Sequence, residues 1–172
     1  MAGFLLLAAL GCQGQSGSGG NDKVDGNSTP AVAKSGLAAS DGIAVSIGKS
    51  EFLKLVMDYE KNPETWVYQG EIPCIVDFYA DWCAPCRITS PILEELAVEF
   101  SGRIKVYKVN IDKERELAAV FGVQSIPTFL YCPMEGNPTI SAGIANTPDA
   151  TRDMFRDHIQ QILLKKSSSS PL

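Results

Sequence analysis

The segment from residue 74 to residue 100 constrains the fold most strongly. Its first part, CIVDFYA (residues 74–80), is almost entirely apolar and contains one charged residue, Asp77. An apolar run of this length is typical of a central strand that is buried on both faces of a sheet. Helical spacing of apolar residues follows over residues 83–100. The sequence therefore predicts a buried strand that leads directly into a helix.

The chain from residue 43 onward extends this pattern into an α/β domain. Expected strands are IAVSI (43–47), CIVDFYA (74–80), RIKVYKVNI (103–111), PTFLYC (127–132) and NPTISAG (137–143), and expected helices are 49–60, 83–100, 112–122 and 147–166. The order is a βαβαβ half followed by a ββα half. This order implies a central mixed sheet with helices on both faces.

The N-terminus, MAGFLLLAALGC (residues 1–12), is a short apolar run that ends in Cys12. It is far shorter than a membrane-spanning helix but long enough for the core of a signal peptide. Small residues before a cysteine are similar to a bacterial lipobox, although Ala9 stands where Leu is usual and no Lys or Arg precedes the run. We expect Cys12 to be lipidated. A truncated or misassigned start and plain secretion are the alternatives.

Three further segments follow this leader. Residues 13–42 are rich in Gly, Ser, Asn and Asp and are expected to form a flexible tether, residues 43–166 form the globular domain, and residues 167–172 form a disordered tail. A tether directly after a lipid-acceptor cysteine gives a membrane-anchored domain the reach to meet substrates. We therefore expect an extracytoplasmic, periplasmic protein that is anchored through lipidated Cys12.

Charge and histidine content exclude two classes of function. The formal net charge is −5 and the isoelectric point is near 4.9, which argues against a nucleic-acid partner because phosphate binding needs clustered Lys and Arg. The chain has one histidine, His158, and no second CxxC or HxxxH motif to complete a zinc site. We expect neither a metal site nor a cofactor.

The motif Cys83-Ala-Pro-Cys86 lies where the predicted strand passes into the predicted helix. Unpaired N–H groups and the helix dipole stabilise a thiolate at that position, so the pKa of Cys83 should be low enough for nucleophilic attack near neutral pH. Cys86 is expected to be less exposed and close enough to form a disulfide with Cys83. Cys83 would attack a substrate disulfide and Cys86 would resolve the mixed disulfide, while the reverse sequence would oxidise a dithiol.

Asp77 is the second informative residue, because burial of a carboxylate is costly unless the group has a partner or a task. Burial should raise its pKa, which suits Asp77 to take a proton from Cys86 and to return it in the reverse direction. We expect Lys108, in the strand KVYKVN, to moderate its charge. A purely structural Asp77 would instead be hydrogen-bonded.

The segments DFYADWCAPCR, PILEEL, YKVNID, FGVQSIPTF and AGI occur in this order along the chain. In content, order and spacing they resemble the thioredoxin family over roughly residues 43–165. The resemblance implies the thioredoxin fold, with Cys83 as the attacking cysteine, Cys86 as the resolving cysteine and Asp77 as the buried carboxylate.

The resemblance also assigns roles outside the CxxC motif. It implies a cis peptide bond before Pro127, which packs against the disulfide and leaves the Ile126 backbone to pair with an extended substrate. Trp82 would shield the site, Gly143 would permit close approach of the substrate, and Pro91 would kink the active-site helix. Departures from the usual family pattern are Ala84 for Gly, Arg87 for Lys, and a longer connector that contains Trp66.

The function that follows is a monomeric thiol-disulfide oxidoreductase that reduces or exchanges disulfides in exported proteins and receives electrons from a membrane or soluble donor. The Ala-Pro dipeptide and the Ile before Pro127 are closer to reducing thioredoxins than to strong oxidants. An extracytoplasmic oxidase or isomerase, a dedicated cytochrome-maturation reductase and a non-catalytic adaptor remain alternatives. The intact set Cys83, Cys86, Asp77 and Pro127 argues against the adaptor.

Cys74 and Cys132 have no role in the family pattern. The resemblance implies that their strands are antiparallel with Asp77 opposite Phe129, and the constant index sum of such a ladder then puts Cys74 opposite Cys132. The pair should lie at the end of the sheet remote from Cys83. Two alternatives are open: a structural disulfide, which would persist in an exported protein, or two small buried thiols.

Overall fold

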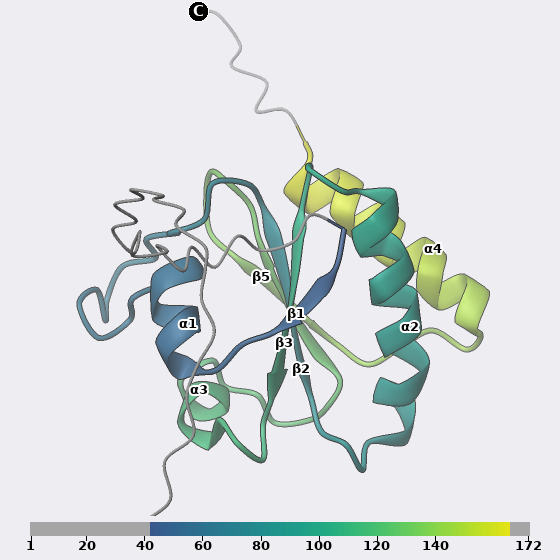
Figure 1. Cartoon of the computed structure of the whole chain (residues 1–172), viewed down its shortest axis with the longest axis horizontal. Coiled ribbons are helices and arrows are strands. Elements are labelled where there is room, and N and C mark those ends of the chain that lie inside the picture. Colours follow the sequence, from purple (N-terminus) through teal and green to yellow (C-terminus); the bar gives the residue numbers. More distant parts are fainter. Residues whose placement is uncertain (1–41, 166–172) are drawn as a thin grey trace, which may run out of the picture. The chain divides into compact units, whose positions relative to one another are not determined.

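A computed structural model describes residues 42–165 of the chain (Figure 1). The expected leader with Cys12, residues 13–41 of the tether, residue 166 of the expected domain and the tail 167–172 lie outside this range, so their assignments stay predictions. None of the helices in the described range is both long and apolar enough to cross a membrane.

Within residues 42–165, five strands form one mixed sheet in the order β1-β3-β2-β4-β5. The strands are β1 (Ala44–Ser46), β2 (Cys74–Tyr79), β3 (Lys105–Asn110), β4 (Thr128–Cys132) and β5 (Thr139–Ala142). β3 runs parallel to β1 and β2, whereas β4 runs antiparallel to β2 and β5. The predicted mixed sheet is confirmed, with the apolar strand β2 at its centre.

Helices cover both faces of this sheet, as the sequence predicts. They are α1 (Lys49–Leu55), α2 (Ala84–Glu99), α3 (Arg115–Val120) and α4 (Pro148–His158), and a turn of π-helix, η1 (Ile159–Leu163), continues α4. In Figure 1, α1 and α3 lie on one face of the sheet and α2 and α4 on the other. α2 follows β2 after a short loop, so the strand delivers the CxxC motif to the first turn of a helix.

Alternation along β2 divides its side chains between two cores. Cys74, Val76 and Phe78 belong to the core under α1 and α3, whereas Ile75 belongs to the core under α2 and α4. Because successive side chains of a strand point to opposite faces, Asp77 points toward the α2 and α4 side. The buried carboxylate therefore lies on the same face of the sheet as the helix that carries the cysteines.

Helix α1 is shorter than the expected 49–60 because a contact with a later part of the chain ends it. Leu55 is its last residue, and Met57 then forms an antiparallel β-bridge with Tyr68. The N–H of Gln69 donates to the carbonyl oxygen of Val56 at 2.9 Å. Residues 56–73, called the connector below, therefore fold back on themselves between α1 and β2.

Helices α2 and α4 are joined by two arginine–glutamate pairs. Arg152 contacts Glu95 at 3.0 Å and Arg156 contacts Glu99 at 2.8 Å. Both glutamates lie in the second half of α2, beyond Pro91, which stands inside the helix. The helix continues as one element through this proline, and the expected kink stays a prediction.

Candidate active site

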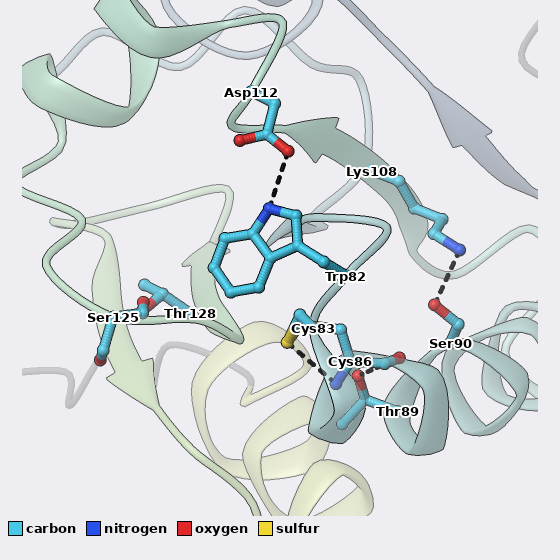
Figure 2. The surroundings of a disulfide bond; sticks show 9 residues. All are labelled: Trp82, Cys83, Cys86, Thr89, Ser90, Lys108, Asp112, Ser125 and Thr128. Atoms are coloured by element: carbon cyan, nitrogen blue, oxygen red, sulfur yellow. Dashed lines mark hydrogen bonds between the residues drawn. A yellow bond between two sulfur atoms is a disulfide. The ribbon is translucent and has the colours of Figure 1, made fainter.

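Cys83 and Cys86 form a disulfide at the N-terminus of α2 (Figure 2). Cys83 is the N-cap of the helix, and its sulfur accepts the backbone N–H of Cys86 at 3.2 Å. This N–H is one of those that lack a partner at the start of a helix, so it is available to a thiolate once the disulfide is reduced. The helix terminus therefore favours negative charge on the Cys83 sulfur.

The two cysteines differ less in exposure than the sequence suggests. Cys83 is 3% exposed and Cys86 is 2% exposed. Ala80 and the partly buried Ile111 and Ile126 pack in the same cluster as the two cysteines. Both cysteines are buried in the oxidised state, so the feature that distinguishes them here is their position on the helix, with Cys83 at the N-cap.

Asp77 is fully buried, which confirms the predicted burial, and neither carboxylate oxygen has a hydrogen-bond partner among the described residues. Burial raises the pKa of Asp77 to about 7, and the charge of Lys108 acts in the opposite direction. The missing hydrogen bonds argue against a purely structural carboxylate. A group with a pKa near neutrality can both accept and return a proton.

Lys108 lies next to Asp77 in the parallel register of β2 and β3, but its ammonium group points elsewhere. Its Nζ donates to Ser90 Oγ at 2.9 Å and lies 5.1 Å from the centre of the Tyr79 ring (Figure 2). The positive charge of Lys108, which we expected to moderate Asp77, therefore acts on the carboxylate without forming an ion pair with it. The reason is that Ser90, on α2, offers Lys108 a hydrogen bond at the edge of the core.

An open pocket of about 390 Å³ borders this side of the site. Tyr79, Ala80, Asp81, Cys86, Arg87, Ser90 and Lys108 line it. The pocket brings solvent beside Cys86, and Asp77 is not one of its lining residues. Protons can therefore be exchanged with solvent from the Cys86 side of the disulfide.

Trp82 is 66% exposed, and the N–H of its indole points toward Asp112 (Figure 2). Its Nε1 donates to Asp112 Oδ2 at 2.9 Å. The N–H of Asp112 donates to Asn110 Oδ1 at 3.0 Å, and Asn110 Nδ2 donates to Asp81 Oδ2 at 3.3 Å. Sequence reasoning did not identify Asn110 and Asp112 as site residues, although two polar residues at and just beyond the end of a buried strand were a usable indication.

The loop before β4 supplies the other wall of the site. The peptide bond between Ile126 and Pro127 is cis, which confirms the expectation from the resemblance. The N–H of Gly143 donates to the Pro127 carbonyl oxygen at 2.9 Å, and Thr128 Oγ1 donates to the Ser125 carbonyl oxygen at 2.7 Å. These bonds bring the proline loop and Gly143 together beside the CxxC motif.

Gly143 has φ +84°, a backbone conformation that side chains rarely adopt, and no atom lies within 4 Å of the position that a Cβ would occupy. The glycine therefore leaves open space next to the proline loop. This is compatible with the close approach of a substrate that the resemblance implies.

Cys74 and Cys132 lie opposite each other in the β2–β4 register, as predicted. Both are fully buried, and the structure has them as two thiols without the disulfide that was one of the two alternatives. The pair lies where β2 starts and β4 ends, whereas the CxxC motif follows the other end of β2. Across residues 42–165, no three His, Cys, Asp or Glu side chains gather in a way that could hold a metal ion.

Comparisons with known proteins agree with this geometry. A family model described as Thioredoxin matches residues 54–157. A thioredoxin from Borreliella burgdorferi is 41% identical over 115 residues, which cover 67% of this chain and 97% of that protein. A chloroplastic M-type thioredoxin from Spinacia oleracea is 44% identical over 85 residues, which cover 48% of this chain and 46% of that protein.

Solved structures give the same result. The N21Q mutant thioredoxin from Halobacterium salinarum NRC-1 aligns with a TM-score of 0.50 and 25% identity, covering 69% of this chain and 92% of that one. The part of the chain matched by the family model contains the disulfide, Asp77, the cis proline and Gly143.

Proposed function

Because the chain belongs to the thioredoxin family and is a disulfide oxidoreductase of the thioredoxin type, we propose that it reduces or exchanges disulfides in exported proteins. The observation that carries the proposal is the Cys83–Cys86 disulfide at the N-terminus of α2, with the Cys83 sulfur at the N-cap position. There the pair can cycle between dithiol and disulfide.

The first step is attack by the reduced Cys83. Its thiolate, stabilised by the free N–H groups of the first turn of α2, attacks one sulfur of the substrate disulfide. A mixed disulfide forms between Cys83 and the substrate, and the other substrate sulfur leaves as a thiolate. The cis proline loop and the open space at Gly143 support this step because they leave room for an extended substrate beside the sulfur.

The second step resolves the mixed disulfide. Asp77 accepts the proton of the Cys86 thiol, and the Cys86 thiolate attacks the Cys83 sulfur. The substrate leaves with both of its sulfurs reduced, and the Cys83–Cys86 disulfide is formed. Support for this role comes from the pKa of Asp77, about 7, and from its two carboxylate oxygens without hydrogen-bond partners.

The direction of exchange depends on the reduction potential of the pair and on the electron supply. The Ala84-Pro85 dipeptide and Ile126 before the cis proline favour a reductant. An extracytoplasmic oxidase or isomerase and a cytochrome-maturation reductase are the alternative functions. Equilibration of the full chain with glutathione buffers measures the potential. A value near that of a strong oxidant would contradict the reducing direction.

We further propose that the protein acts at a membrane surface through lipidated Cys12, because an apolar leader precedes this cysteine and a tether rich in Gly and Ser follows it. Cys12→Ser should move the full-length protein from the membrane to the soluble fraction of the host cell, and it should abolish labelling by a radioactive fatty acid. Equal labelling of both forms would contradict the anchor.

A trapping experiment tests the function itself. Cys86→Ser in the full chain cannot resolve the mixed disulfide, so substrates should stay attached to Cys83 and can be identified by mass spectrometry after release with a reductant. The matched control is the double variant Cys83→Ser, Cys86→Ser, which should trap nothing. The proposal is wrong if the single and double variants hold the same proteins, or if the trapped proteins are not exported.

A further inference from the structure

Cys74 and Cys132 have the geometry of a pair that can be joined. They are direct partners in the antiparallel register of β2 and β4, so both side chains point to the same face of the sheet. Opposite residues of such a ladder have Cα atoms about 4.5 or 5.5 Å apart, and both values lie inside the range of disulfides, about 4.4–6.8 Å. Both side chains belong to the same buried cluster of the core. A bond therefore needs local adjustment of the side chains and no change of register.

The connector covers this pair on the side of α1 and α3. The Tyr68 hydroxyl donates to the Ile72 carbonyl oxygen at 2.7 Å. The Trp66 ring stacks on the Tyr68 ring, with centroids 6.4 Å apart and planes 8° from parallel. Trp66 and Tyr68 pack against the core cluster that contains both cysteines, and both cysteines are 0% exposed.

Two polar atoms in the connector have no hydrogen-bond partner among the described residues. They are Tyr59 Oη and Trp66 Nε1, and both are buried. A buried polar group without a partner regains its hydrogen bond to water when the segment opens, so these atoms lower the free energy needed to lift the connector from the sheet. The part of the protein that covers the cysteine pair is therefore also a part in which two buried polar atoms reduce the cost of local opening.

The position of the pair keeps it apart from the active site. Cys74 is the first residue of β2 and Cys132 is the last residue of β4. The CxxC motif follows the opposite end of β2, and the length of that strand alone is about 16 Å. The two cysteine pairs cannot contact each other within one molecule.

We propose that Cys74 and Cys132 form a second redox pair, which a low-molecular-weight disulfide oxidises to a cross-strand bond when the connector opens. One protein thiolate attacks the small disulfide, forms a mixed disulfide and releases one small thiol. The second protein thiolate then attacks the sulfur of the first cysteine and releases the other small thiol. Two protein thiols become one disulfide, and their two protons and two electrons pass to the two small thiols.

The bond would join the two strands that carry the two halves of the active site. β2 leads to the CxxC motif, and β4 starts after the cis proline. Oxidation would therefore link β2 to β4 covalently at the end of the sheet remote from the active site, and it would not alter any active-site group. We expect the oxidised pair to raise the midpoint of thermal unfolding by several degrees and to leave insulin reduction intact.

The test uses the full chain, equilibrated in buffers with increasing ratios of oxidised to reduced glutathione. After an acid quench, free thiols are alkylated under denaturing conditions and the peptides are mapped by mass spectrometry. A linked Cys74–Cys132 peptide is expected to accumulate with its own midpoint, distinct from that of Cys83–Cys86, and Cys132→Ser should lose this peptide alone. Alkylation of both cysteines at every ratio, or glutathione bound to each without the link, would overturn the proposal.

A second measurement tests the covering role of Tyr68. Tyr68→Phe removes the hydroxyl's bond to the Ile72 carbonyl and should speed oxidation of the pair by about tenfold, because this hydrogen bond no longer opposes opening. Val67→Ala is the matched control, since Val67 is the exposed neighbour in the same connector, and it should leave the rate within about twofold. Equal rates for both variants would show that the connector does not control access and would overturn this part of the proposal.

Discussion

Strand β2 has a cysteine pair at each end, and the two pairs differ in almost every physical respect. Cys83 and Cys86 follow the strand, lie three residues apart at the start of α2 and are joined in the structure. Cys74 and Cys132 come from two strands, lie in the apolar core and are separate thiols. The comparison shows that the chemistry of a cysteine is decided by the backbone and solvent around it.

The physical cause can be stated for each end. At the helix N-terminus, N–H groups without helical partners point at the sulfur and stabilise its negative charge. In the sheet interior, burial raises the pKa of the Cys132 thiol well above its ordinary value. One pair is therefore prepared for attack and the other is kept protonated until its surroundings change.

Among substitutions that compare the two cysteine pairs of β2, the largest expected effect on activity is that of replacing Cys83. Cys83→Ser should lower the rate of insulin reduction by about a thousandfold or more, because a hydroxyl is a poor nucleophile at neutral pH and cannot form the disulfide. The assay is the turbidity of insulin reduced by dithiothreitol. Cys74→Ala is the matched change at the other end and should retain turnover; loss of activity in both variants would remove the functional distinction between the pairs.

Asp77→Asn tests whether the carboxylate serves the active-site end of β2. The amide cannot accept the proton of Cys86, so the rate of mixed-disulfide resolution near pH 7 should fall by at least about tenfold. The wild-type rate should rise with pH through the pKa of Asp77, about 7, as the carboxylate ionises, and the variant should lack this step. Stopped-flow tryptophan fluorescence over pH 5 to 9 can follow the rate of mixed-disulfide resolution. Identical pH profiles for wild type and Asp77→Asn would refute the proton-transfer role.

The same substitution should also change how stability depends on pH. The folded protein keeps a proton on Asp77 up to about pH 7, whereas the unfolded chain releases it near the ordinary pKa of 3.8. Raising the pH through this window therefore favours the unfolded state, and wild type should lose on the order of 3 kcal/mol relative to Asp77→Asn between pH 4 and pH 8. Urea unfolding at several pH values measures the difference, and parallel curves for the two proteins would contradict it.

A smaller effect should distinguish the buried pair by stability instead of activity. Cys132→Ala removes a fully buried sulfur from the core and should lower the free energy of unfolding by about 1–2 kcal/mol. Turnover should be kept. Urea unfolding in the presence of reductant measures the change, and an unaltered midpoint would mean that the core around Cys132 relaxes to fill the space.

The smallest effect concerns the bond between Trp82 and Asp112. Asp112→Asn keeps the size of the side chain and still offers an oxygen to the indole, so insulin reduction should change by about twofold or less. Asp112→Ala removes the bond and should give the larger KM of the two variants. A larger loss with Asn than with Ala would show that the charge of Asp112 matters more than the position of Trp82.

The features that sequence reasoning predicted well depend on local patterns. The apolar run of β2 and the helical spacing of α2 are properties of neighbouring residues, so their order and the mixed sheet followed from them. The partnership of Cys74 with Cys132 followed from the constant index sum of an antiparallel ladder, once the resemblance to the thioredoxin family had placed Asp77 opposite Phe129. In both cases geometry leaves few alternatives.

The features that it missed depend on contacts between distant residues. α1 ends early because Met57 pairs with Tyr68, and nothing in the sequence around Leu55 indicates this bridge. Lys108 turns to Ser90 although it is the register neighbour of Asp77, because a long side chain can choose among several partners around it. Such choices are decided by the three-dimensional surroundings, which local periodicity does not contain.

The arginine–glutamate pairs between α2 and α4 bear on how this domain carries mechanical load. Both pairs hold the rear half of α2, and Ile92, Leu93 and Leu96 anchor the same half in the core. Pro91 cannot donate a backbone hydrogen bond, so the front turns that carry the cysteines are joined to this anchored half by one bond fewer. When a substrate that is bound to Cys83 through a mixed disulfide exerts a force on it, the part of α2 before Pro91 and the loop that precedes the helix should be displaced first. The part of α2 after Pro91 is held by the core and by the two arginine–glutamate pairs, so it transmits the force to α4 and the sheet.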